Sequence, residues 1–154
     1  MRDRALLSVF YACGARRNEA VNIKVNDVLP DKNLLYIKKD KGGKERYVPM
    51  IGKVKRDILN YLTIARSMLM GRQVHDYLFV AITGEALGGS SMYDRIRRLA
   101  KKAEIEKQVG LHILRHSIAT HLLDNGMSLV QIAKFLGHSS LESTQIYTHL
   151  KDVE

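Results

Sequence analysis

The sequence contains a single cysteine, Cys13, so no disulfide can form within the chain. Scarce cysteine is typical of proteins from a reducing compartment, and we expect a cytoplasmic protein in which Cys13, set among apolar neighbours, belongs to the core. No stretch approaches the roughly 18 consecutive apolar residues of a membrane-spanning helix, and no small-residue cleavage site follows the first apolar run. The sequence therefore predicts a protein that is neither membrane-spanning nor exported.

Acidic residues are also scarce. The chain has 16 aspartates and glutamates against 25 lysines and arginines, which gives a formal net charge of +9 at pH 7. Such an excess favours a polyanionic partner, because binding releases the counterions condensed on the polyanion. Nucleic acid is the first candidate for that partner.

No internal repeat and no low-complexity linker divides the 154 residues, a length that suffices for one domain with a core of its own. Two β-prone runs, 34–37 and 46–48, flank Gly42 and Gly43 and predict a lysine-rich β-hairpin. A further short strand is expected over 77–81. Apolar residues at helical spacing predict helices over 3–13, 17–23, 52–70, 90–103, 112–125, 128–136 and 141–150. The expected class is α+β, mainly α-helical, with a small antiparallel sheet.

One segment, Leu111 to Tyr147, gathers residues that suit the chemistry of a phosphodiester. A phosphodiester is anionic, and its transition state concentrates further charge on the non-bridging oxygens. A guanidinium group stays protonated and matches two phosphate oxygens, so two arginines can stand where other enzymes place metal ions. Arg16 and Arg115 are the candidates. His112 lies three residues before Arg115 on the same predicted helix, so both side chains face the same way.

Tyr147 is the candidate nucleophile. A tyrosine has a pKa of about 10, which makes it a better leaving group than a sugar hydroxyl. A phosphotyrosyl bond can therefore be reversed without an external energy source. Reversal of this kind is what the exchange of DNA strands requires.

These residues resemble the tyrosine recombinase (phage integrase) family, and most of all its Xer-like members. The resemblance extends from Arg2 to Leu150, and the order and spacing of the motifs agree throughout. The matching motifs are GARRNE with Arg16, KGGKERYVP with Lys41, HILRH with His112 and Arg115, LGH ending at His138, and Tyr147. The resemblance implies the tyrosine recombinase catalytic-domain fold, conservative site-specific recombination, and neither a metal nor a nucleotide cofactor.

The resemblance also implies a role for each residue. Tyr147 would attack the scissile phosphate and leave a 3′-phosphotyrosyl link and a free 5′-hydroxyl. Arg16 and Arg115 would bind the non-bridging oxygens. Lys41 would donate a proton to the departing 5′ oxygen.

Three further roles are implied in the same way. His112 would act as proton acceptor, and His138 would hydrogen-bond the phosphate. Glu19, one helical turn after Arg16, would orient the site from behind, as would His116 beside His112. The net positive charge of the chain also predicts contacts to the DNA backbone from Lys44, Arg95 and Arg98.

By the same resemblance, the partners would be double-stranded DNA and other recombinase protomers. The protomers would form a tetrameric synapse on DNA, whereas the isolated domain would be monomeric, cytoplasmic and associated with the nucleoid. Residues 1–154 would form a single catalytic domain. The SAM-like core-binding domain that precedes it in full-length relatives would be absent from this chain.

Other interpretations of the same residues remain open. His112 and His116 have the i, i+4 spacing of zinc ligands, but HILRH lacks the glutamate of the metalloprotease motif and places an arginine on the ligand face. The stretch from Met127 to Tyr147 also resembles a helix-turn-helix, which would suit a non-catalytic DNA-binding module. A type IB topoisomerase would share the phosphotyrosyl chemistry but would relax supercoils instead of joining partner sites.

Overall fold

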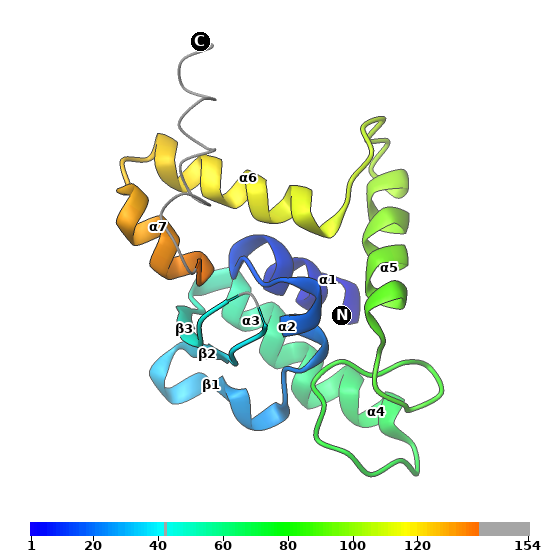
Figure 1. The fold of residues 1–154 in the computed structure, drawn as a ribbon. Coiled ribbons are helices and arrows are strands. Elements are labelled where there is room, and N and C mark those ends of the chain that lie inside the picture. The colour runs from blue at the N-terminus through cyan, green and yellow to red at the C-terminus, as the bar shows by residue number, and fades with distance from the viewer. Residues whose placement is uncertain (42, 139–154) are drawn as a thin grey trace.

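The structure is a computed structural model that describes residues 1–41 and 43–138. Figure 1 shows a mainly helical molecule with a small sheet on one side, which confirms the predicted α+β class. The helices are α1 (Arg2–Leu7), α2 (Arg17–Val21), α3 (Gly52–Asn60), α4 (Arg66–Met70), α5 (Gly89–Lys102), α6 (Leu111–Asp124) and α7 (Leu129–Leu136). The strands are β1 (Val28–Leu29), β2 (Leu34–Ile37) and β3 (Arg46–Pro49).

The helix predicted over 3–13 is continuous, but its second half is wider than an α-helix. After α1 the chain continues as a π-helical turn over Ser8–Ala12. The segment stops at Gly14, whose φ of 62° lies in the left-handed region that glycine adopts without a steric penalty. A Cβ at this position would also lie 2.7 Å from the side chain of Leu136. Gly14 therefore permits a close approach between this turn and the end of α7.

The predicted hairpin is present and belongs to a three-stranded antiparallel sheet in the order β1-β2-β3. Strands β2 and β3 pair with Leu35 opposite Val48 and Ile37 opposite Arg46. In β3 the buried positions alternate, so Arg46 and Val48 face the interior. The two-residue strand β1 was not predicted, because two residues are too few to show an alternating pattern.

The strand predicted over 77–81 is wrong. The segment forms isolated bridges, from Tyr77 to Lys24 and from Val80 to Ala86, and no ladder. Its backbone groups are satisfied in other ways: the Val80 amide donates to the hydroxyl of Tyr61 at 2.9 Å. A short apolar run is therefore buried here without neighbouring strands, and its periodicity could not distinguish the two cases.

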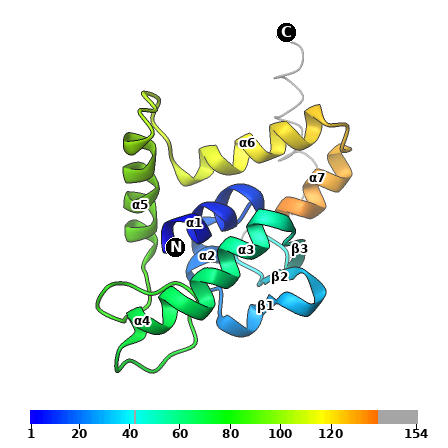
Figure 2. The ribbon, with the colours of Figure 1, turned by 180° about the vertical axis from the view of Figure 1, so that it is seen from behind.

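The helices pack around two groups of buried side chains. The main core lies where α1, α3, α5 and the sheet meet, and it includes the largest buried side chains, such as Phe10 and Tyr61. A smaller cluster joins α6 to α7 through Ala119, Leu123 and Ile132. Figures 1 and 2 show α6 lying across one end of the molecule, with α5 and α7 on either side of it. This arrangement brings α6 over the turn at Gly14.

Cys13 is fully buried in the main core, as predicted, and burial raises the pKa of its thiol to about 12. Because the thiolate is the reactive form, we expect no alkylation of native protein by iodoacetamide at pH 8 and complete alkylation after unfolding in guanidinium. Mass spectrometry of the intact protein measures both. Modification of native protein at the rate of the unfolded chain would contradict the buried position.

Candidate active site

Arg115 projects from α6 into the interior and is only 8% exposed. Its Nη2 donates to the Leu136 carbonyl oxygen at 2.6 Å, and its Nη1 donates to the carbonyl oxygen of Gly14. The Gly14 carbonyl belongs to the turn that follows Ser8–Ala12, and the Leu136 carbonyl belongs to the last residue of α7. These two carbonyls hold the guanidinium group in one orientation.

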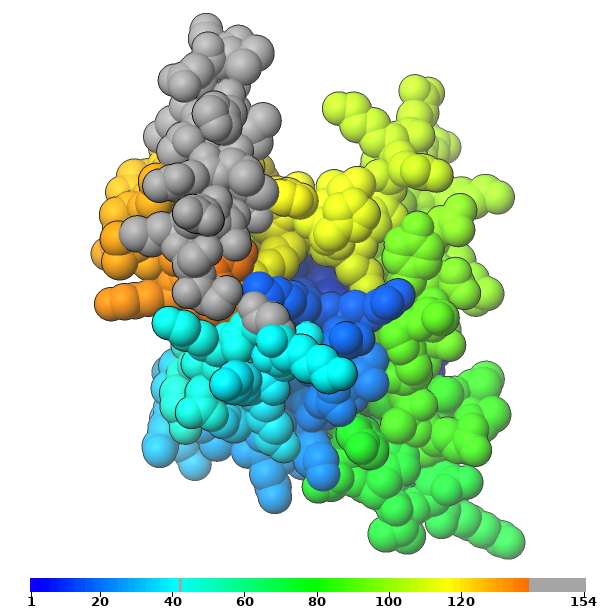
Figure 3. Space-filling model, in the orientation of Figure 1, coloured from blue at the N-terminus to red at the C-terminus, as the bar shows by residue number. Residues whose placement is uncertain are grey.

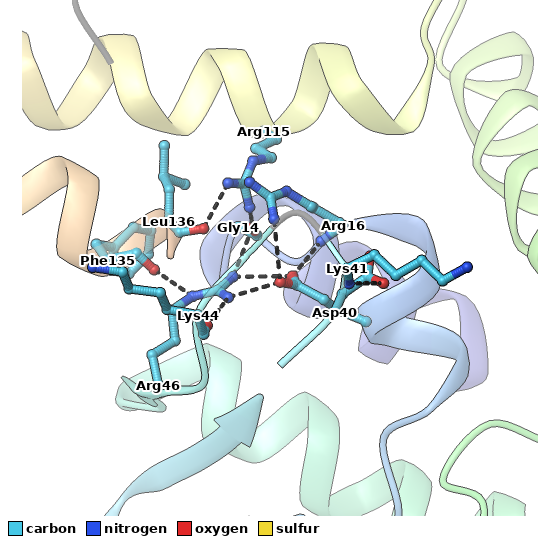
Figure 4. Close-up of polar contacts among 10 residues, drawn as sticks. Gly14, Arg16, Asp40, Lys41, Lys44, Arg46, Arg115, Phe135 and Leu136 are labelled. Carbon is cyan, nitrogen blue, oxygen red and sulfur yellow. Dashed lines mark hydrogen bonds and ion pairs between the residues drawn. The ribbon is translucent and has the colours of Figure 1, made fainter. Parts of the chain in front are cut away.

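Arg16 lies two residues beyond the turn at Gly14 (Figure 4), and both Arg16 and Arg115 lie near enough to His138 to perturb its imidazole. Its Nη1 atom is buried without a hydrogen-bond partner among the described residues and lies 4.0 Å from the Glu19 carboxylate. The backbone N–H of Arg16 donates to Glu19 Oε2 at 2.8 Å. The structure thus brings the two predicted arginines together, with Glu19 behind Arg16.

The side chain of Glu19 is fully buried, and it is paired with an arginine that the sequence analysis did not single out. Arg46 donates to the two carboxylate oxygens of Glu19, at 2.9 Å from Nη1 and 3.1 Å from Nη2. A signal was present in the sequence, because Arg46 occupies an inward position of a strand whose other inward residue, Val48, is apolar. A charged side chain at such a position requires a buried partner.

His138 lies at the end of α7, directly beyond the αL cap Gly137, and forms an isolated bridge with Gly43 of the β2–β3 connection. The arginines 16, 46 and 115 are all near enough to perturb its imidazole. His138 therefore lies at the place where α7, the hairpin connection and the two predicted arginines meet.

His112 and His116 lie on α6 and are exposed at the surface, with ring centroids 6.4 Å apart. His112 is three residues before Arg115 on the same helix, as predicted. Burial, His112 and Arg115 together lower the pKa of His116. Figure 3 shows the face on which α6, the segment around α2 and the β2–β3 connection adjoin one another.

Lys41 is not turned toward the arginines. Its side chain extends away from Arg16 and Arg115 (Figure 4). Its backbone N–H donates to the carboxylate of Asp40 at 2.6 Å, and a turn follows in which the Gly43 N–H donates to the Asp40 carbonyl. The structure therefore brings the connection that carries Lys41 to the site, but not its ammonium group.

The residues predicted to contact the DNA backbone differ in their surroundings. Lys44 and Arg98 are exposed, whereas Arg95 forms an ion pair with Asp3 that ties α5 to α1. The backbone N–H of Lys44 donates to the Gly137 carbonyl, which leaves its side chain in solvent. Lys44 and Arg98 are therefore better placed than Arg95 to meet a phosphate.

Tyr147 and the helix predicted over 141–150 lie outside the described residues. Within the part that is described, no three histidine, cysteine or carboxylate side chains gather as metal ligands would. The same residues include no helix long and apolar enough to cross a bilayer.

His138 has a strongly lowered pKa of about 4, because burial and the cations of Arg115, Arg16 and Arg46 disfavour the imidazolium form. The ordinary value is 6.5, so between these two values the unfolded chain binds a proton that the folded chain does not. The free energy of unfolding should therefore fall as the pH falls through this window. The imidazole should be neutral at pH 7.

An NMR titration of the His138 ring tests this prediction, with His138→Gln as the control for unfolding measured at several pH values. We expect the variant to lose less stability between pH 6.5 and pH 4 than the wild type does. A ring that titrates at or above its ordinary value would contradict the prediction.

The fold and the site together define a class of protein: a mainly helical domain in which two guanidinium groups and several imidazoles lie close together. The family model "Phage integrase family" matches residues 1–154. The chain belongs to the phage integrase family.

Similar proteins agree with this assignment. The tyrosine recombinase XerD of Halalkalibacterium halodurans is 38% identical over 151 residues, which is 97% of this chain and 50% of that protein. The crystal structure of XerA recombinase matches with a TM-score of 0.84 and 36% identity over 99% of this chain and 55% of that one. XerH recombinase, in a post-cleavage complex with palindromic difH substrate, matches with a TM-score of 0.81 and 31% identity over 97% of this chain and 42% of that one. The chain thus spans about half the length of the XerD relative.

Proposed function

We propose that this chain is the catalytic domain of a site-specific DNA recombinase, which cleaves and rejoins strands of double-stranded DNA through a 3′-phosphotyrosyl intermediate at Tyr147. The observation that carries the proposal is that Arg16 and Arg115 both lie near His138, where a buried carboxylate holds the backbone of Arg16 and two backbone carbonyls fix the guanidinium group of Arg115. Groups fixed in this way need little reorganisation when charge develops on a phosphate.

Each candidate then has a defined task. Arg16 and Arg115 bind the non-bridging oxygens and stabilise the charge of the transition state. Neutral His138 accepts or donates one hydrogen bond to the phosphate. His112 accepts the proton of the Tyr147 hydroxyl.

Lys41 protonates the departing 5′ oxygen in this proposal, and that task requires its side chain to turn. A lysine has four rotatable side-chain bonds, and the phosphate of bound DNA would attract its ammonium group toward the arginines. The connection itself already lies beside His138 through Gly43. Turning the side chain would therefore move the ammonium group toward this part of the site.

DNA is the partner that the charge favours, and the XerH relative was captured with a difH substrate. We further propose that other protomers join this one in a tetrameric synapse on DNA and that the isolated domain is monomeric. Residues 1–154 then act as a single catalytic domain that works on DNA in the cytoplasm, and the chemistry uses neither a metal nor a nucleotide cofactor.

A pool of labelled nicked duplexes of random sequence tests the activity without knowledge of the target. The nick lets the cleaved end diffuse away, so a covalent protein–DNA adduct accumulates and survives a denaturing gel. We expect the adduct from wild-type protein in the presence of EDTA, and none from Tyr147→Phe. Failure of the wild type to form an adduct would contradict the proposal and favour the non-catalytic helix-turn-helix module.

A second assay separates recombination from topoisomerase activity. Two marked duplexes that contain the sequence recovered from the adduct should exchange strands, whereas a type IB topoisomerase would relax supercoiled plasmid without joining the duplexes. The relatives named above are recombinases, which favours the first outcome.

A further inference from the structure

We infer that Arg46 is a positioning residue of this site, whose buried guanidinium group locks together the chain segments that carry the phosphate-binding side chains. The inference rests on the proposed function, because it assigns Arg46 to the same centre. Arg46 is only 8% exposed, although it stands on a strand of a small sheet.

Arg46 donates hydrogen bonds to three segments that are distant from β3 in the sequence. Nε donates to the Phe135 carbonyl at 2.7 Å, and Nη2 donates to the Gly14 carbonyl at 3.4 Å. Both terminal nitrogens also bond to the carboxylate of Glu19. Arg46 thus connects β3 with the turn before Arg16, with α2 and with the end of α7.

Arg46 and Arg115 both donate hydrogen bonds to the backbone at Gly14 and at the end of α7 (Figure 4). Each of them donates to the Gly14 carbonyl, and they take the adjacent carbonyls of Phe135 and Leu136 at the end of α7. One guanidinium group arrives from β3 and the other from α6. The position of Arg115 therefore depends on backbone that Arg46 also holds.

Arg46 also affects Arg16, because it neutralises the carboxylate of Glu19 that lies between them. This carboxylate lies within hydrogen-bond distance of both terminal nitrogens of Arg46, whereas it stays 4.0 Å from Arg16 Nη1. Without Arg46, the buried carboxylate would keep a strong need for a cation. The guanidinium group of Arg16 is the cation beside it. Loss of Arg46 should therefore draw Arg16 onto Glu19 and withdraw its charge from the phosphate.

Arg66 offers a matched control for the structural part of this role. It is a partly buried arginine that also donates to backbone carbonyls, at 2.8 Å to Tyr77 and 3.0 Å to His75. None of these groups belongs to the site. Arg66→Met should lower the unfolding temperature but should leave adduct formation unchanged at temperatures where the variant is folded.

The test compares Arg46→Met, Arg66→Met and the double variant Glu19→Gln/Arg46→Met, each below its own unfolding temperature. We expect Arg46→Met to form the adduct at least about 100-fold more slowly than the wild type, the size of effect seen when one oriented charge-stabilising group is lost. Its affinity for DNA should be unchanged. The double variant should cleave faster than Arg46→Met, because an uncharged amide no longer captures Arg16.

An Arg46→Met variant that cleaves like the wild type, or a double variant no faster than the single one, would overturn the inference. A measurement without DNA tests the positioning role of Arg46 separately from the proposed function. The NMR resonances of the Nε–H groups of Arg16 and Arg115 should shift in Arg46→Met and stay in place in Arg66→Met, whether or not the wild type forms an adduct. Unchanged resonances in Arg46→Met would equally overturn the positioning role.

Discussion

Arg16→Ala should form covalent adduct with nicked DNA at least about 100-fold more slowly than the wild type, which corresponds to a barrier raised by roughly 3 kcal/mol. The reason is the loss of one of two cations aimed at the non-bridging oxygens. The Nη1 atom of Arg16 has no hydrogen-bond partner among the described residues, so its removal should cost the fold little. Adduct formation is measured over time on a denaturing gel, and DNA affinity by fluorescence anisotropy.

Arg17→Ala is the matched control for this prediction. Arg17 carries the same charge at the next position, but its side chain is exposed and packs beside Gly89 at the start of α5. We expect Arg17→Ala to cleave like the wild type, and Arg16→Ala to retain most of its DNA affinity. A loss of binding in Arg16→Ala as complete as the loss of cleavage would show that Arg16 serves binding and not the chemical step.

Glu19→Ala should lower the free energy of unfolding by about 3–5 kcal/mol, because it leaves the buried guanidinium group of Arg46 without its carboxylate. Urea unfolding followed by circular dichroism measures this change. The comparison is Asp76→Ala, which removes the carboxylate of an exposed ion pair with Lys24 and should change stability little. Equal losses in the two variants would contradict the buried pair.

Local sequence patterns predicted most of the fold. The helices predicted over 90–103, 112–125 and 128–136 and the hairpin follow from apolar periodicity and from turn residues, both of which act over a few positions. The strand over 77–81 was wrong because a buried apolar run has the same pattern with or without neighbouring strands. The π-helical turn over Ser8–Ala12 has no such pattern.

The residues of the candidate site could be predicted from the sequence, but the hydrogen bonds that hold them in place could not. The motifs around Arg16 and Arg115 resemble a known family, and the structure brings the two side chains together as expected. The bonds that hold them connect residues far apart in sequence, such as Arg115 with Gly14 and Arg46 with Phe135. Local spacing carries no information about such pairs: the inward position of Arg46 indicates that it needs a buried partner, but not that Glu19, Gly14 and Phe135 supply it. The direction of the Lys41 side chain was unpredictable for the same reason.

The proposed chemistry is tested by identifying the residue that becomes joined to the DNA. Adduct from wild-type protein and nicked duplex, formed in EDTA, is digested with trypsin and nuclease, and the modified peptide is sequenced by mass spectrometry. We predict a nucleotide joined to the hydroxyl oxygen of Tyr147 through its 3′-phosphate. Attachment at any other residue, or cleavage that requires a divalent metal and leaves no attachment, would contradict the account.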